Sequence, residues 1–151
     1  MSEKASSLVA GAKQWATYYG KFTQGEESAA LTAQLRARAA WDANDADAFA
    51  ASFAENGSIL VDDQQVNGQD AIKTFFTDAF GGQLAGTKLL TEPIEIKVLE
   101  PGVAVVITDG GVLYDGETTV PAERVVRGTW VAAQVDGEWR VVSQQTSPVK
   151  G

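Results

Sequence analysis

The block of residues 41–76 constrains the fold of this chain more than any other part of its sequence. Asn44 is a residue type that caps helices, and Phe49 and Phe53 follow it at helical spacing. Asn56-Gly57 is then a pair of the kind that ends helices. The block therefore predicts that one helix ends near Asn44 and that a second, short helix follows.

A β-hairpin and a third helix complete this block. Residues 58–61 and 65–66 flank a polar turn at residues 62–64, which predicts two short strands. A helix should begin near residue 67 and end at the glycines at positions 81 and 82. An apolar stripe at helical spacing runs along this helix, formed by Ile72, Phe75, Phe76 and Phe80. Aromatic side chains from two helices thus converge, and they predict one wall of a core or of a pocket.

A longer helix precedes the block. Thr23 and Glu26 have the spacing of a capping box, so a helix should start near residue 25 and continue to Trp41. One face of this helix carries Ala33, Gln34, Ala37 and Trp41. Small side chains along a face leave room for a ligand cavity, but they also permit tight helix packing. Both interpretations stay open from the residues alone.

After Gly86 the pattern becomes that of β-strands. Four long segments alternate apolar and polar residues, namely Thr87–Leu99, Val103–Tyr114, Glu123–Val135 and Glu138–Gln145. Asp136-Gly137 joins the last two and is the strongest two-residue hairpin signal in the chain. The order of elements predicts an α+β fold with its helices on one face of an antiparallel sheet. We expect one domain over residues 23–151, preceded by an extension over residues 1–22.

Composition narrows the chemistry. The chain has no histidine and no cysteine, which excludes imidazole bases, thiol nucleophiles and the usual zinc ligands. Its net charge of −8 disfavours nucleic-acid partners, and no apolar run approaches the roughly 18 residues of a membrane span. The acidic residues show no calcium-loop spacing. We therefore expect a cytoplasmic protein with an uncharged or apolar small ligand, no metal and no cofactor.

Two sequence segments carry a resemblance to a known family. The motif VNGQDAIKTFF precedes the strands, and RGTWVAAQVDGEWRVVSQQT ends them. In this order they resemble the nuclear transport factor 2-like superfamily over residues 25–148, and within it the SnoaL-like proteins. The resemblance is strongest to the SgcJ–EcaC branch of enediyne biosynthesis proteins. It implies a cone-shaped, cystatin-like α+β barrel whose curved sheet wraps around three helices and leaves a deep apolar pocket. It also implies homodimers formed through the outer face of the sheet.

Some members of this superfamily are enzymes and others only bind ligands or partners, so the fold alone leaves function open. The resemblance to steroid isomerases would place their aspartate base at Val61, their tyrosine donor near Ala37 and their acid donor near Thr129. None of these positions retains the required chemistry, and Asp62 next to Val61 sits in a polar turn. The residues argue against steroid-isomerase chemistry.

Asp109 is the candidate catalytic acid for a cyclase, isomerase or dehydratase. It follows Val103, Val105 and Ile107 at a period of two, so it shares their face of a strand. If that face lines the cone, Asp109 is buried among apolar side chains. The alternative is that Asp109-Gly110-Gly111 forms a bulge or turn that exposes the carboxylate.

The neutral and aromatic residues of the cone are the candidate ligand contacts. Arg127 would share the cone mouth with Thr129, unless it is an exposed arginine paired with a neighbouring acid. Trp41 and Phe76 could equally be plain core. The candidate ligand-binding residues are Gln34, Ala37, Trp41, Phe76, Tyr114, Arg127, Thr129 and Gln144.

Three functions fit these observations. The first is a small-molecule binding protein of secondary metabolism that holds a hydrophobic polyene or enediyne-core intermediate and either shields it or assists its cyclisation. The second is an enzyme that uses Asp109 for proton transfer. The third is a non-catalytic dimerisation module whose residues 1–22 recruit a partner. Taken by itself, this segment is either a partly ordered extension or a flap that lays Trp15 and Tyr18 over a pocket or a partner subunit.

Overall fold

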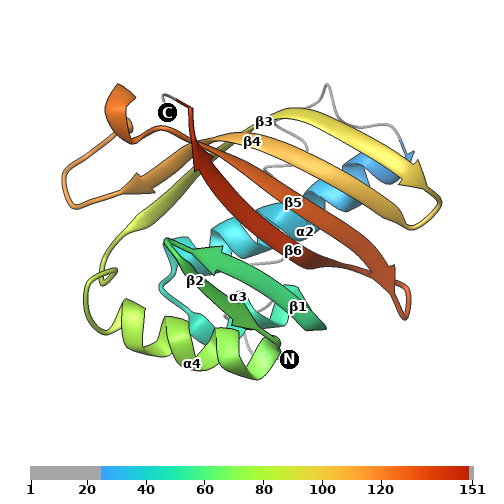
Figure 1. Cartoon of the computed structure of the whole chain (residues 1–151), viewed down its shortest axis with the longest axis horizontal. Helices are drawn as coiled ribbons and strands as arrows, with labels where there is room; N and C mark the ends of the chain where they lie inside the picture. Colours follow the sequence, from blue (N-terminus) through green and yellow to red (C-terminus); the bar gives the residue numbers. More distant parts are fainter. Residues whose placement is uncertain (1–24, 150–151) are drawn as a thin grey trace.

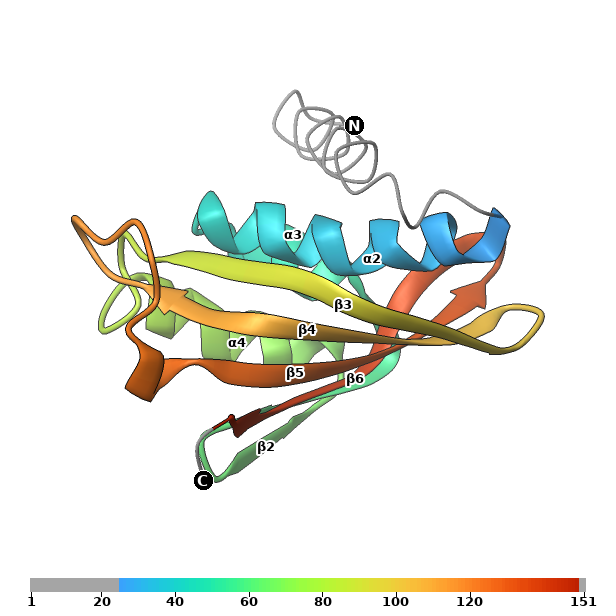
Figure 2. The ribbon, with the colours of Figure 1, turned by 90° about the horizontal axis from the view of Figure 1, so that it is seen from above.

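Six strands form one curved, unclosed sheet, and three helices pack against its concave face (Figures 1 and 2). The computed structural model of the protein describes residues 25–149. The helices are α2 (Gly25–Asp42), α3 (Ala46–Ala51) and α4 (Gln69–Phe80), with a 3-10 turn, η2 (Ala122–Arg124). The strands are β1 (Phe53–Val61), β2 (Gln64–Asn67), β3 (Lys88–Glu100), β4 (Val103–Leu113), β5 (Val126–Val135) and β6 (Glu138–Pro148).

The strand order explains how the curved sheet encloses a space, the interior of the fold, between itself and the helices. It is β2-β1-β6-β5-β4-β3, with β1 parallel to β6 and every other pair antiparallel. The α+β fold predicted from the sequence is confirmed, although the sheet ends at β2 and β3 instead of closing into a barrel. The predicted capping residue Thr23 and the extension over residues 1–22 lie outside the described residues.

The second helix is shorter than the sequence predicts. It ends at Ala51, and Phe53 begins β1, which continues through Asn56-Gly57. The cause is a close approach between strands, since a Cβ on Gly57 would lie 2.9 Å from the Val141 carbonyl oxygen on β6. Asn56-Gly57, a pair typical of helix ends, therefore lies within β1 and allows β1 to pass close to β6.

Asn44 also has a different role from the one predicted. Asp45 caps α3, because its side chain accepts a hydrogen bond from the Ala48 amide at 3.1 Å. Asn44 instead donates to the carbonyls of Trp41 and Thr87 and accepts from the Gly86 amide. It joins the end of α2 to the start of β3 and so fixes the depth at which Trp41 enters the interior.

The aromatic side chains predicted to converge from residues 41–76 form the floor of the interior. Trp41, Phe49, Phe76 and Phe80 contact one another edge to face or tilted, with ring centroids 4.4–6.4 Å apart. Phe53 joins the cluster through Phe49 at 5.3 Å. Each such side chain contributes about 1.5–3 kcal/mol when it is fully buried. This cluster therefore holds α2, α3 and α4 together beneath the sheet.

The alanine face of α2 packs directly on the sheet. Ala33, Ala37 and Ala40 are buried, and Gln34 donates to the Thr91 hydroxyl on β3 at 3.0 Å. Of the two interpretations of this face, the structure has the tightly packed one. Among the described residues, none of the helices combines the length and the apolar character needed to cross a membrane.

Candidate ligand-binding pocket

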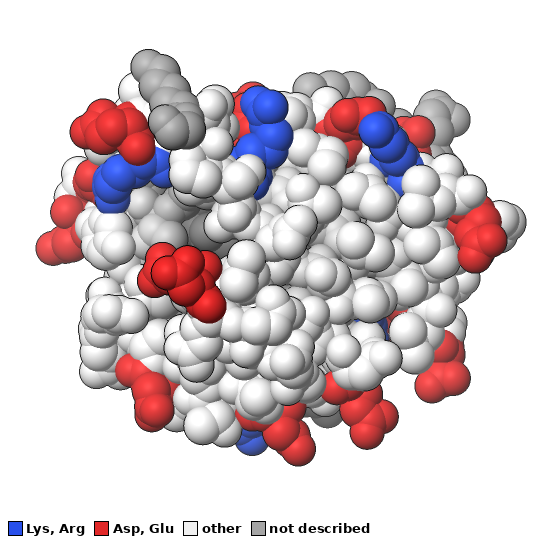
Figure 3. Space-filling model, viewed as in Figure 1, with Lys and Arg blue, Asp and Glu red and all other residues white. Residues whose placement is uncertain are grey.

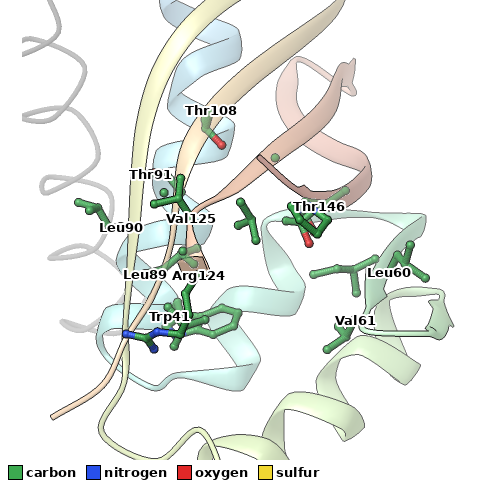
Figure 4. Close-up of a pocket in the computed structure, with 18 of the residues that line it drawn as sticks. Trp41, Leu60, Val61, Leu89, Leu90, Thr91, Thr108, Arg124, Val125 and Thr146 are labelled. Carbon is green, nitrogen blue, oxygen red and sulfur yellow. The ribbon is translucent and has the colours of Figure 1, made fainter. Parts of the chain in front are cut away.

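A cavity of about 360 Å³ lies between the concave face of the sheet and the aromatic floor (Figure 4). This volume is in the range of about 300–1,000 Å³ that is usual for small-molecule sites. Leu60 and Val61 from β1 lie across the cavity from Leu89 and Thr91 on β3 (Figure 4). The apolar walls are formed by Trp41, Phe49, Ile59, Leu60, Val61, Leu89, Leu90, Val112, Val125, Val126, Trp130 and Pro148.

The pleat of the central strands decides which side chains face this cavity. On β4 and β5 the even-numbered residues point inward, because successive side chains alternate between the faces of a sheet. The strand register then places Thr108 opposite Gly128 and Trp130 opposite Gln144. Three neighbouring strands thus bring a hydroxyl, an indole and an amide to one part of the wall.

The polar groups inside the cavity are neutral. Thr91, Thr108 and Gln144 are each at most 5% exposed. The Trp130 indole N–H donates to the Thr108 hydroxyl at 3.2 Å, and Gln34 donates to that of Thr91. Buried polar groups with partners of this kind keep their positions when a ligand enters. The interior can therefore orient an uncharged molecule through a few hydrogen bonds.

Charged residues occur only at the rim of the cavity. Arg124 donates to both carboxylate oxygens of Glu117 at 2.5 and 2.6 Å, and its guanidinium lies 5.1 Å from the centre of the Tyr114 ring. The Glu117 carboxylate also accepts from the Tyr114 amide. The hydrogen bond from Arg124, with that amide, holds the pKa of Glu117 below its usual range. The two other charged lining residues, Asp62 and Glu123, are exposed.

Comparison with known proteins places this geometry in a family. The model of the SnoaL-like domain matches residues 26–144. The chain belongs to the SnoaL-like family. No curated protein matches it.

Solved structures show the same fold as this SnoaL-like chain. A domain of unknown function with a cystatin-like fold from Nostoc punctiforme aligns with a TM-score of 0.74 at 23% identity, covering 83% of this chain and 78% of the other. A nuclear transport factor 2-like protein from Novosphingobium aromaticivorans aligns at 0.66 and 20% identity, covering 79% of each. A ketosteroid isomerase-like protein from Erwinia carotovora aligns at 0.65 and 17%, covering 83% and 98%. At these identities the likeness concerns the fold.

The structure brings part of the predicted ligand set into the SnoaL-like pocket. Trp41, Tyr114 and Gln144 line the cavity, as does Val61. Gln34 and Ala37 are buried between α2 and the sheet, and Phe76 is buried in the aromatic floor, so none of these three reaches the cavity. They support the wall from behind.

Asp109, Arg127 and Thr129 lie on the opposite, outer face of the sheet. Asp109 pairs with Arg127 directly across the strands, and Arg127 donates from Nε at 2.8 Å and from Nη2 at 3.1 Å. Of the two interpretations of Arg127, the structure has the exposed arginine paired with a neighbouring acid, whereas the placement of Asp109 and Thr129 inside the cone is wrong. The cause is that Val103, Val105 and Ile107, which carried the inference, are themselves only half-buried. The buried partners are Ala104, Val106 and Thr108.

Thr108, Gly128 and Trp130 are site residues that the sequence argument missed. They sit one position away from Asp109, Arg127 and Thr129, on the face that the cavity occupies. One signal could have found them. On β5 the inner face carries Trp130 and Ala132, whereas the outer face carries Arg127, and a large aromatic opposite a charge marks the buried side.

Proposed function

We propose that this protein binds a neutral, largely apolar small molecule in the cavity, and that the molecule is a hydrophobic polyene or enediyne-core intermediate of secondary metabolism. The observation that carries this proposal is the combination of apolar and aromatic walls with neutral hydrogen-bonding groups in the interior. A conjugated, flat molecule fits between aromatic surfaces such as Trp41 and Trp130. Membership of the enediyne branch of the SnoaL-like family is part of the same proposal.

The arrangement favours holding a ligand over proton transfer. A general acid or base must reach the proton that it moves, within about 3 Å or through one water. Asp109 is on the outer face and engaged with Arg127, while Asp62 and Glu123 are exposed at the rim. We propose that the pocket shields its ligand and holds a conformation from which cyclisation proceeds.

Tryptophan fluorescence tests this proposal. Trp41 and Trp130 line the cavity, whereas Trp139 is buried elsewhere. Titration with a conjugated polyene should quench the emission, and the quenching should fall in Trp41→Phe and Trp130→Phe. Trp139→Phe is the matched control and should quench as the wild type does. No saturable quenching in the wild type, or equal losses in all three variants, would remove the assignment of the pocket.

We also propose a homodimer formed through the outer face of the sheet. Figure 3 shows this face with an uncharged centre and with its charges gathered around the edge. The half-buried residues Val105, Ile107, Thr129 and Val131 lie on this side of β4 and β5. A face of this kind suits contact with a second copy of itself, because a two-fold interface must complement its own surface.

Sedimentation velocity tests the dimer. We expect the wild type to sediment as a dimer and Val131→Glu to sediment as a monomer. Gln83→Glu adds the same charge at an exposed position away from the sheet and should leave the dimer intact. A wild type that stays monomeric at high concentration would contradict the proposal.

A further inference from the structure

Gly128 lies in the wall of the pocket, at a point where polar groups from three strands converge on its backbone. A Cβ at this position would lie 2.8 Å from the Thr108 hydroxyl oxygen, 3.0 Å from Trp130 Nε1 and 3.5 Å from Gln144 Nε2. The backbone of Gly128 is not in the left-handed region, so its conformation alone does not require glycine. Glycine is needed here because the three polar groups pack against its Cα and leave no room for a side chain.

The hydrogen bonds of these polar groups determine whether each of them can donate to a ligand or accept from it. An indole N–H only donates, so in its bond with Trp130 the Thr108 oxygen is the acceptor. The hydroxyl hydrogen of Thr108 is then directed to another partner. Among the described residues, the side chain of Gln144 makes a single weak contact, from Nε2 to the Gln145 carbonyl at 3.4 Å. This part of the cavity wall therefore offers a hydroxyl donor and an amide donor, with the hydroxyl oriented by Trp130.

We infer that Thr108 and Gln144 form a subsite for a neutral oxygen acceptor, a carbonyl or ether oxygen carried by the apolar ligand. This inference rests on the proposed function and specifies which class of molecule the pocket selects. The groups nearest to Gly128 include no cationic side chain, so a carboxylate bound beside Thr108 and Gln144 would be desolvated without a countercharge there. A neutral oxygen meets two donors at no such cost.

The subsite should make the pocket discriminate between molecules of one shape. A neutral hydrogen bond contributes about 0.5–1.5 kcal/mol, so two of them correspond to a preference of about 5-fold to 150-fold. An analogue without the oxygen loses this contribution and leaves the buried donors of Thr108 and Gln144 unpaired.

The test compares two probes of one skeleton. One is a conjugated methyl trienone, and the other is the hydrocarbon in which a methylene group replaces the carbonyl oxygen. Dissociation constants follow from tryptophan quenching. The wild type should bind the ketone about 10-fold more tightly than the hydrocarbon, within the range set by two hydrogen bonds. The carbonyl stretching band of the bound ketone should also shift to lower frequency than in a hydrocarbon solvent.

Variants separate this subsite from the rest of the pocket. Thr108→Val and Gln144→Met should reduce the preference for the ketone and leave hydrocarbon affinity unchanged, whereas Thr108→Ser retains the hydroxyl and should keep the preference. Thr129→Val is the matched control, because it makes the same change on the outer face of the neighbouring strand, away from the cavity. Gly128→Ala should also abolish the preference, because its Cβ would lie 2.8 Å from the Thr108 hydroxyl oxygen and would displace that group.

The outcomes are distinguishable. If neither probe binds the wild type, the proposed function fails. If both probes bind the wild type equally and the carbonyl band does not shift, the pocket stands and the oxygen subsite is overturned. If Thr108→Val fails to fold, the Thr108→Ser and Gln144→Met variants decide the question. An unchanged preference in Gln144→Met, with no loss of the band shift, would overturn the role of the amide.

Discussion

Two polar pairs on the same two strands, one on each face of the sheet, differ in burial, in charge and in access to the cavity. Thr108 and Trp130 form a neutral hydrogen bond on the inner face of β4 and β5, where both are buried. Asp109 and Arg127 form a two-pronged ion pair on the outer face, where water reaches both. From residue type alone, the ion pair would be the expected catalytic or binding site. Because side chains alternate between the two faces of the sheet, it is the neutral pair that lines the cavity.

The two faces also differ in how tightly they are packed, and Gly110 gives the largest expected effect. On the inner face, a Cβ at Gly110 would lie 1.8 Å from the Leu90 carbonyl oxygen and 2.7 Å from its carbon. Backbone cannot yield as a side chain does, so Gly110→Ala should cost about 3 kcal/mol of unfolding free energy or more. Urea denaturation measures this. Thr129→Ala on the outer face should cost much less, and equal costs would break the comparison.

Thr108→Val should have the next largest effect on stability. It preserves the shape of the side chain but leaves the buried indole N–H of Trp130 without its acceptor. An unpaired buried donor costs about 1–3 kcal/mol, which urea denaturation can resolve. Thr129→Val is the control, since it makes the same change on the outer face of the neighbouring strand. If Thr129→Val lowered the free energy of unfolding as much as Thr108→Val does, the inner hydrogen bond would not contribute specifically to stability.

A second arginine–carboxylate pair, Arg124 with Glu117 at the rim, extends the comparison to pH. The folded-state pKa of Glu117 is lowered, mainly by its hydrogen bond from Arg124. A lowered acid pKa contributes stability above the unfolded-state pKa, and that stability is lost as pH falls through the folded-state value. Melting temperature in acid should therefore fall less steeply in Glu117→Gln than in the wild type. Identical acid limbs would contradict the role of this pair.

At Asp42 burial shifts the carboxyl pKa in the opposite direction. Desolvation raises the pKa of its carboxyl group, although the group accepts a hydrogen bond from the Leu89 amide at 2.7 Å. The folded-state pKa of Asp42 is above its unfolded-state pKa, so the ionised carboxylate destabilises the fold at pH values above both. This penalty is relieved as the pH falls and the carboxylate is protonated. Asp42→Asn should therefore gain stability relative to the wild type at neutral pH and lose that advantage in acid.

Several parts of the fold could be predicted because their signals are local. Asp136-Gly137 predicts a hairpin, and both residues have the positive φ angles that its turn requires, 51° and 84°. The stripe at Ile72 and Phe76 predicts α4, and both residues are fully buried there. In each case the residues that carry the signal are neighbours in the chain.

Other features depended on contacts that are distant in sequence. Phe53 fits the period of a helix as well as that of a strand, and its pairing with Val141 decides for the strand. The inner face of β4 could not be chosen because valine or isoleucine occurs on both faces, at Val105 and Val106 for example. Only the helices that cover one face distinguish them.

Asp109→Asn should have the smallest effect, and it tests the comparison most directly. The pair that it weakens is solvated, and exposed ion pairs contribute little to stability. We expect polyene affinity and the preference for the ketone to match the wild type, and the melting temperature to change within error. Thr108→Val measured beside it should lose the preference, because its hydroxyl faces the cavity. A loss of ligand binding in Asp109→Asn alone would mean that the outer face takes part in recognition, and the assignment of the two faces would have to be reversed.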